Sequence, residues 1–370
     1  MSDNFVSIPF KLMEEFMIDV FKGLGVPEED ARICADVLIT ADKRGIDSHG
    51  IGRLKPIYYD RIKAGIQLPI TAIDIIRDGP TTAVVDGNNG MGHVIGYRCM
   101  QMAIDKAQTY GMGMVAARNS THYGIAGYYT LMAIEKNMIG ITGTNARPSI
   151  APTFGVENML GTNPLTIGIP SDEAFPFVID CATSVSQRGK IEVYERINQE
   201  IPPGWVIDAD GMTRTDTAQI LKDLVAGTAA LTPLGGIGEE QGGHKGYGYA
   251  TAVEILSAAL QGGAFLKALT GVDEHGNKQP YRLGHFFIAI DINSFIDVEK
   301  FKTTSGEILR QLRNSRKAPG HNRIFTAGEK EYDAWLERQH TGVPVNIPLQ
   351  NDMKIMREEL GLYQYCFPFD

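Results

Sequence analysis

The glycine-rich segment Gly90–Gly96 constrains the fold more than any other part of this 370-residue chain. It follows a short β-branched run, Thr81–Val85, which predicts a strand, and it precedes a helix expected over 95–109. A strand, a glycine-rich turn and a helix form the phosphate-binding unit of the doubly wound Rossmann fold. Here the last glycine comes one residue late, and the next expected strand ends at Arg118 rather than at an acid. The sequence therefore argues against an ordinary Rossmann site.

Hydrophobic spacing in the rest of the chain predicts a mixture of helices and short strands. Helices are expected over 8–23, from Pro27 to Ala41, near 217–226, from Gly248 to about Leu260, and in the tail from Ser305. Strands are expected at 114–117, 139–142 and 286–290, the last of these being the last clear strand. The stretch 192–232, rich in Pro, Asp and Thr, is expected to be an excursion, and 347–370 is weakly informative.

Composition limits the classes of partner. A chain with 43% hydrophobic residues is long enough for a large core and for two or three domains. The formal net charge is -9, and Lys and Arg are scattered, so neither nucleic acid nor a membrane surface is an expected partner. No stretch approaches the roughly 18 apolar residues of a membrane span, and Glu14, Glu15 and Asp19 interrupt any apolar signal region. Cys34, Cys99, Cys181 and Cys366 form no CxxC motif, which fits reduced thiols in the cytoplasm.

Reactive side chains gather in the segment Arg44–Arg53, which contains Asp47, Ser48, His49 and Arg53. If the chain turns helical after Ser48, His49 and Arg53 stand four apart on one face. An imidazole can move the proton of a hydroxyl group, and a guanidinium can fix a planar carboxylate. The plainer interpretation is a helix N-terminus that Ser48 caps, with His49 merely exposed.

Further polar motifs follow in order along the chain. They are Asn119–Gly124, Gly161–Leu165, Val178–Ser184, Arg188–Ile191, Pro203–Asp208, Pro233–Gly236 and Gly243–Gly248. With the Asp47–His49 motif, these segments resemble the malate/L-lactate dehydrogenase family of the second type, which includes sulfolactate and ureidoglycolate dehydrogenases, a diketogulonate reductase and a cyclic-imine reductase. The resemblance covers roughly residues 5–330. No single motif is specific, but their shared order makes a chance match very unlikely.

The resemblance implies an α/β fold with a mixed sheet that binds its cofactor in a non-Rossmann manner. It also implies a helical domain built from both chain ends, and a homodimer whose site lies near the subunit interface. The expected division places 1–75 and 300–370 in the helical domain, and 76–299 in the α/β domain that binds cofactor and substrate.

The resemblance also implies roles for individual residues. His49 and His122 share the proton-transfer role, with His49 favoured, and Ser48 is expected to hydrogen-bond the substrate oxygen. Asp180, which ends an expected strand, can orient an imidazole and stabilise its charged form, or it can cap a helix. The expected catalytic residues are His49, His122, Asp180 and Ser48, and the expected substrate-binding residues are Arg53 and Arg147.

The expected cofactor site combines several of these segments. The turn at Gly243–Gly246 precedes a predicted helix, so its N–H groups, the helix dipole and Lys245 can bind a pyrophosphate; the alternative is a glycine-rich turn with a solvated lysine. By resemblance, Gly161–Pro164 and Asp180–Ser184 lie beside the nicotinamide. The expected cofactor-binding residues are Thr162, Asn163, Asp180, Ala182, Thr183, Ser184, His244, Lys245, Gly246, Pro319, Gly320 and His321.

One segment departs from the family pattern. Where the family commonly has Pro-Gly-Glu, this chain has Pro319–His321. An acid there would bind the ribose hydroxyls and repel a 2′-phosphate, whereas His321, with Arg316, Lys317 and Arg323 nearby, imposes no such repulsion. We expect NAD as the cofactor, with NADP possible.

The sequence thus predicts a cytoplasmic NAD(P)-dependent oxidoreductase that moves a hydride between nicotinamide and a small 2-hydroxy or 2-oxo acid, with malate and oxaloacetate first and without a metal. One alternative is a reductase of another 2-oxo acid or of a cyclic 2-imino acid. Two others come from different classes: a hydrolase whose paired histidines bind a metal, and a silent nucleotide-binding module.

Overall fold

The computed structural model describes residues 5–370, apart from the side chain of Arg196. The strands are β1 (Val6–Ile8), β2 (Asp74–Asp78), β3 (Thr82–Asp86), β4 (Met112–Ser120), β5 (Met138–Thr144), β6 (Leu165–Ile169), β7 (Phe177–Cys181), β8 (Val206–Asp208), β9 (Thr213–Arg214), β10 (Ala229–Leu231), β11 (Leu283–Asp291) and β12 (Val343–Val345). The α-helices are α1 (Phe10–Gly23), α2 (Glu28–Lys43), α3 (Asp60–Lys63), α4 (Gly92–Tyr110), α5 (Gly127–Glu135), α6 (Arg188–Arg196), α7 (Thr217–Ala226), α8 (Gly243–Ala258), α9 (Val298–Asn314), α10 (Glu329–Thr341) and α11 (Ile347–Leu360). Short 3-10 helices are η1 (Ile51–Arg53), η3 (Leu266–Leu269) and η4 (Ile292–Ser294), and η2 (Leu54–Tyr59) is a π-helix.

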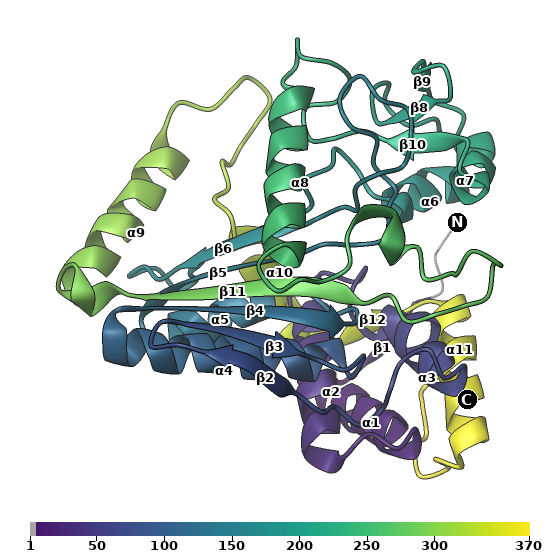
Figure 1. Ribbon diagram of the computed structural model, residues 1–370, viewed down its shortest axis with the longest axis horizontal. Coiled ribbons are helices and arrows are strands. Elements are labelled where there is room, and N and C mark those ends of the chain that lie inside the picture. Colours follow the sequence, from purple (N-terminus) through teal and green to yellow (C-terminus); the bar gives the residue numbers. More distant parts are fainter. Residues whose placement is uncertain (1–4) are drawn as a thin grey trace.

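A seven-stranded mixed sheet forms the centre of the molecule, in the order β2-β3-β4-β11-β5-β6-β7. β3 and β4 run parallel, and the other neighbouring strands are antiparallel. The central strand β11 places Phe287 opposite both Val115 and Thr142. α4 and α5 cover one face of the sheet, and α8 packs against the other (Figure 1). The mixed-sheet α/β fold is therefore confirmed, as is the absence of a doubly wound parallel topology in the described chain.

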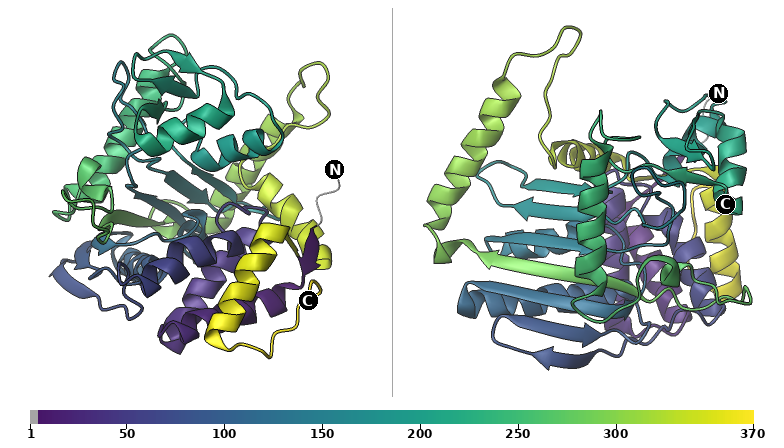
Figure 2. Two further views of the ribbon diagram at one scale, coloured as in Figure 1. Left: turned by 90° about the vertical axis from the view of Figure 1, so that its right-hand side faces the viewer. Right: turned by 45° about the horizontal axis from the view of Figure 1, so that its top comes forward.

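The two chain ends form one helical domain beside the sheet (Figure 2). β1 pairs antiparallel with β12, with Val6 opposite Val345. α1 packs on α2, and Phe16 of α1 contacts Phe367 edge to face, with ring centroids 5.2 Å apart. The apolar faces of these helices bury one another, so residues from both ends share one core, as expected.

Two features of the C-terminal part were not expected. The strand at 286–290 is not the last one, because β12 follows it by more than fifty residues. The segment 347–370 contains α11, whose Met353 and Met356 are fully buried. A strand as short as β12 forms through pairing with β1, and local sequence carries little sign of such a distant partner.

A smaller lobe holds a three-stranded antiparallel sheet, β10-β8-β9, with α6 and α7 beside it. The expected helix near 217–226 is confirmed as α7: Asp216 accepts a hydrogen bond from the Gln219 N–H at its start, and Gly227 ends it at a φ of 76°. The sequence does not predict α6, which lies partly in the expected excursion at 192–232.

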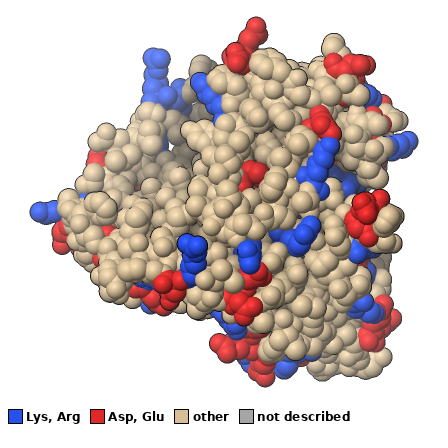
Figure 3. Space-filling model, in the orientation of Figure 1, with Lys and Arg blue, Asp and Glu red and all other residues tan. Residues whose placement is uncertain are grey.

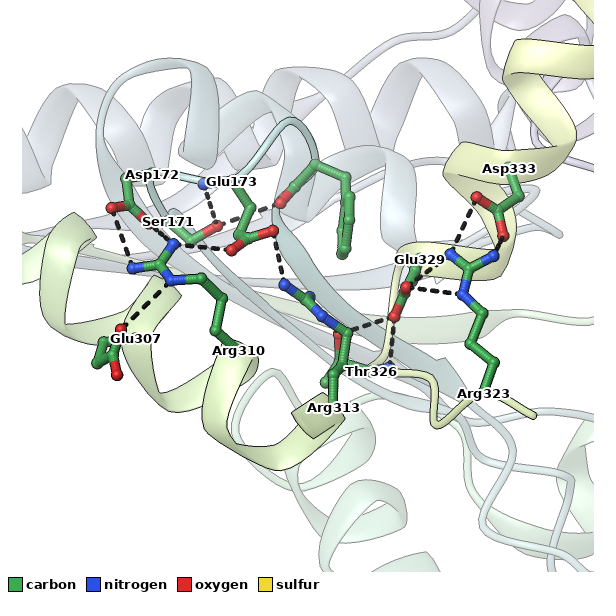
Figure 4. A network of polar contacts seen from close by, with 11 residues as sticks. Ser171, Asp172, Glu173, Glu307, Arg310, Arg313, Arg323, Thr326, Glu329 and Asp333 are labelled. Atoms are coloured by element: carbon green, nitrogen blue, oxygen red, sulfur yellow. Dashed lines mark hydrogen bonds and ion pairs between the residues drawn. The ribbon is translucent and has the colours of Figure 1, made fainter. Parts of the chain in front are cut away.

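Helix α9 stands apart from the helical domain (Figure 1). Arg310 and Arg313 attach it to Asp172 and Glu173 in the turn between β6 and β7 (Figure 4). The expected domain division places residues 300–370, and with them most of α9, in the helical domain. That division stays a prediction. Lys, Arg, Asp and Glu are scattered among uncharged residues over the face in Figure 3. In residues 5–370, no helix is both long and apolar enough to cross a membrane.

Candidate active site

The loop that follows α2 carries the first group of expected site residues. The chain does not become α-helical after Ser48, as one interpretation required: it passes through a turn, then η1, then the π-helix η2. The buried carboxyl of Asp42 fixes this path by accepting a hydrogen bond from the Ile51 N–H at 2.8 Å. Only glycine fits at Gly50, because a Cβ there would lie 1.7 Å from the Asp42 carboxyl oxygen. Arg53 Nε still returns to this loop by donating to the Ser48 carbonyl.

A residue that sequence reasoning missed holds the same loop from outside. Arg338 of α10 donates to both carboxyl oxygens of Asp47 and, at 2.6 Å, to the main-chain carbonyl of Asp42. The two partners lie at opposite ends of the chain, so no local pattern indicated the contact. Arg338 is a positioning residue, because it fixes the segment that carries Ser48 and His49.

The structure brings the two expected imidazoles together. The rings of His49 and His122 stack with centroids 5.7 Å apart and an interplanar angle of 20°. Ser48 Oγ lies 2.8 Å from His49 Nδ1, so Ser48 bonds the imidazole rather than capping a helix. Among the described residues, no group of three or more His, Cys, Asp or Glu side chains is placed to hold a metal ion.

Hydrogen bonds distinguish the two rings. His122 Nδ1 lies 2.6 Å from the Tyr58 hydroxyl and accepts a hydrogen bond from the Gly124 N–H at 3.3 Å. An amide can only donate, so a neutral His122 carries its proton on Nε2. The hydroxyl of Ser48 can donate or accept, so His49 is free to adopt either tautomer.

Burial keeps both imidazoles uncharged near neutral pH. It lowers the pKa of His49 to about 4, with a further contribution from the nearby charge of Arg53. Burial also lowers the pKa of His122 well below its usual value, and His49 adds to this effect. A neutral imidazole can accept a proton or donate a hydrogen bond without bringing a second charge into the site.

A cavity of about 450 Å³ opens beside His122. Its walls include four arginines, Arg53, Arg61, Arg147 and Arg188, together with Thr162 and Tyr281, and none of its lining residues is an acid. Of the expected residues, the cavity thus unites His122, Arg53, Arg147 and Thr162. Ser48 and Arg53 also line a neighbouring cavity of about 670 Å³. Arg61 was missed, because its local sequence resembles an ordinary amphipathic turn.

Asp180 does not bond either imidazole, so the expected triad arrangement is wrong for the described chain. Its two carboxyl oxygens accept hydrogen bonds from the Gly127 N–H at 2.6 Å and from the Thr166 hydroxyl at 2.9 Å. Gly127 is the first residue of α5, and a carboxylate is favourable at a helix N-terminus. Burial raises the pKa of Asp180, and these two bonds oppose the rise. Asp180 thereby fixes the loop between His122 and α5.

Several expected cofactor-binding side chains are engaged inside the protein. Asn163 is fully buried; it donates to Glu254 of α8 at 2.8 Å and accepts from the Ala146 N–H at 3.1 Å. Thr183 donates to the Asn163 carbonyl at 2.9 Å, and Ser184 donates to a nearby carbonyl. These side chains support the wall behind Thr162 rather than pointing free polar atoms at a ligand. Ala182, which is also expected to bind the cofactor, lies next to Thr183 and is half-buried.

The segment expected to bind pyrophosphate forms the first turn of α8 rather than a turn before it. Its glycines allow close packing, since a Cβ at Gly243 or Gly246 would lie 2.1 Å from a carbonyl oxygen of the preceding turn. His244 and Lys245 are exposed. First-turn amides of a helix have no partner within it, so this end of α8 can hold an anionic phosphate.

The segment Pro319–His321 lies in the exposed loop between α9 and α10 and does not line the His122 cavity. Arg316 and Lys317 are exposed there. Arg323, expected to add positive charge near His321, is instead paired with Glu329 at 2.6 Å and with Asp333 at 2.7 Å. The local excess of positive charge is therefore smaller than the sequence indicated.

The glycine-rich segment Gly90–Gly96, which resembles a nucleotide-binding motif in sequence, allows close backbone packing at the start of α4. A Cβ at Gly92 would lie 2.3 Å from the Thr121 carbonyl oxygen and 2.5 Å from that of His122. The Gly92 N–H also donates a hydrogen bond to the Thr121 hydroxyl at 2.9 Å. The glycines thus let the start of α4 support the backbone that carries His122.

Comparisons with known proteins place this arrangement among dehydrogenases. A family model described as malate/L-lactate dehydrogenase matches residues 8–354. A malate dehydrogenase from Pyrococcus horikoshii is 43% identical over 97% of both chains, and an L-sulfolactate dehydrogenase from Methanocaldococcus jannaschii is 40% identical over 94% of this chain and 96% of that one. The crystal structure of malate dehydrogenase from Entamoeba histolytica superposes with a TM-score of 0.93 at 47% identity, covering 97% of this chain and 99% of that chain. The chain belongs to the malate/L-lactate dehydrogenase family and is an enzyme of that dehydrogenase type.

Proposed function

We propose that this enzyme transfers a hydride between NAD(P) and a small 2-hydroxy acid, with malate and oxaloacetate as its substrate pair. The observation that carries the proposal is the cavity that combines four arginines with His122 and has no acidic lining residue. A 2-oxo dicarboxylate brings two negative charges, and guanidinium groups bind carboxylates through paired hydrogen bonds. Relatives named malate dehydrogenase support this choice.

The second candidate substrate is a 2-oxo acid that carries a sulfonate in place of the distal carboxylate. A relative named L-sulfolactate dehydrogenase is 40% identical. A sulfonate is also a multivalent acceptor for guanidinium N–H groups, so the same cavity suits both anions.

The protein's own part in the reaction is to bind, orient and move a proton. When bound, the nicotinamide donates or accepts the hydride. Arg53 and Arg147 hold the substrate carboxylate groups, and Ser48 bonds the substrate oxygen. His122 donates from Nε2 to the reacting oxygen and polarises it, and His49 accepts the hydroxyl proton during oxidation and returns it during reduction. The depressed pKa of His49 ensures that its base form predominates at neutral pH.

The cofactor and assembly complete the proposal. The first turn of α8 holds the pyrophosphate, and Pro319–His321 lies near the adenosine ribose. NAD is the expected cofactor, with NADP accepted. The enzyme is proposed to be a cytoplasmic homodimer with its site near the subunit interface. Light scattering of the purified protein tests whether it is a dimer.

Absorbance at 340 nm tests the function. Purified enzyme is mixed with NADH or NADPH and with oxaloacetate, sulfopyruvate, pyruvate, a cyclic 2-imino acid or no substrate. We expect the fastest loss of absorbance with oxaloacetate or sulfopyruvate. If absorbance falls only with the imino acid, the enzyme is a cyclic-imine reductase instead. If absorbance falls with none of the substrates, the proposal is contradicted. Metal analysis of the same sample tests the absence of a required metal.

A further inference from the structure

Arg61 lacks the acidic partner that several other enclosed arginines of this protein have. Arg118, Arg313 and Arg338 each pair with an acid: Asp86 at 2.8 Å, Glu173 at 2.7 Å and Asp47, respectively. Arg61 makes no ion pair with an acid in the described chain, although burial is sufficient to lower its pKa. A guanidinium held away from water without an anion is unfavourable, so a ligand anion would relieve the cost.

Tyr281, which lines the same cavity, fixes the orientation of Arg61. Its guanidinium carbon lies 4.3 Å from the ring centroid of Tyr281, which contributes a cation–π contact. Tyr281 in turn packs on Gly271, where a Cβ would lie 2.5 Å from the ring. Because the ring has no room to move toward Gly271, it holds the guanidinium at the cavity wall.

Arg61 does not act alone. Arg147 lines the same cavity and is close enough for its charge to lower the pKa of Arg61 further. Two guanidinium groups that repel one another in the empty cavity are a favourable site for one anion between them. The charges of Arg61 and Arg53 both lower the pKa of His122, but only Arg53 is also attached to the Ser48 carbonyl and lowers the pKa of His49, so we assign Arg53 to the reacting end of the cavity.

We propose that Arg61, supported by Tyr281 and acting with Arg147, binds the distal, non-reacting anionic group of the substrate. Arg53 then holds the carboxylate next to the reacting carbon. This assignment rests on the proposed function and makes it narrower: the substrate is a dianion, with a carboxylate or sulfonate at its far end, rather than a lactate-like monoanion.

The test compares oxaloacetate with 2-oxobutyrate, which has four carbons but no distal anion. In Arg61→Leu, we expect kcat/KM for oxaloacetate to fall about 100-fold, the scale of losing a charge-assisted hydrogen-bonded pair, with 2-oxobutyrate changed by less than about threefold. Arg61→Lys keeps the charge without the paired geometry, and we expect an intermediate loss of about tenfold. Arg32→Leu is the matched control, because Arg32 lies on the surface and pairs with Glu28.

A second measurement does not depend on turnover. Malate, added with NAD⁺, is expected to raise the Tm of the wild type and of Arg32→Leu more than 2-hydroxybutyrate does, and this difference is expected to vanish in Arg61→Leu. Tyr281→Leu, which leaves the charge in place, is expected to reduce oxaloacetate selectivity about tenfold.

The outcomes distinguish a failure of the proposed role of Arg61 from a failure of the proposed dehydrogenase function. Equal losses with oxaloacetate and 2-oxobutyrate, or full oxaloacetate selectivity in Arg61→Leu and Tyr281→Leu, would overturn the role of Arg61 while leaving the dehydrogenase function intact. A wild-type enzyme that reduces no 2-oxo acid would overturn both.

Discussion

Two arginine-rich regions of this molecule make opposite use of the same side chain. In the network that joins α9 and α10 to the β6–β7 turn, Arg310, Arg313 and Arg323 all bind carboxylates (Figure 4). Among the arginines that line the cavity beside His122, Arg188 pairs with Glu192 at 2.9 Å, whereas Arg53, Arg61 and Arg147 form no ion pair with an acid in the described chain. A guanidinium paired with an acid completes the fold, whereas one that faces an acid-free cavity is available to an anionic ligand. The identity of the residue alone does not decide between the two roles.

Removing either imidazole of the stacked pair is expected to have the largest effect. His49→Ala or His122→Ala should lower kcat at least about 100-fold, the usual scale for losing a general acid or base, while the cofactor still binds. Stopped-flow turnover and fluorescence titration of NADH measure the two quantities. Near-wild-type turnover in both variants would remove the imidazole pair from the mechanism.

Arg53→Lys tests whether geometry as well as charge matters in the cavity. Lysine keeps the charge but loses the planar fork, so the substrate KM should rise about tenfold or more while the cofactor Kd changes little. Steady-state kinetics and NADH titration provide the comparison. If both ligands weaken equally, Arg53 is structural or lies on the cofactor side.

Arg313→Ala tests the other region, where an effect on stability is expected without an effect on catalysis. Glu173 would lose one of its two arginine partners, so the free energy of unfolding should fall by about 2 kcal/mol, less than for a buried pair that is broken completely. Thermal unfolding should show a Tm lower by a few degrees, with kcat/KM within about twofold of wild type. A large loss of kcat/KM in a variant that still folds would show that the α9 network also contributes to catalysis, and would contradict its purely structural role.

His321→Glu is expected to have the smallest effect. It restores the acid that the family pattern favours, and like-charge repulsion should then reduce NADPH use severalfold relative to NADH. The measurement is the ratio of kcat/KM for the two cofactors in wild type and variant. An unchanged ratio would show that His321 does not face the adenosine ribose.

The sequence predicted those parts of the fold and site that depend on neighbouring residues. Helical spacing located α2 and α7, β-branched runs located the inner strands, and the Asp47–His49 and Asn119–Gly124 motifs located both imidazoles. The misses depend on distant contacts. β12 needs β1 as its partner, and Arg338 reaches Asp47 from the other end of the chain. The availability of Arg61 depends on which side chains surround it after folding.

The central claim is that the acid-free cavity selects a dianionic 2-oxo acid. The most direct measurement is the wild-type ratio of kcat/KM for oxaloacetate to that for 2-oxobutyrate, taken with NADH at low and at high salt. The account predicts a ratio of at least about 100 at low salt, the scale of a charge-assisted pair, and a smaller ratio as salt screens the arginines. A ratio near one at both salt concentrations would contradict the claim.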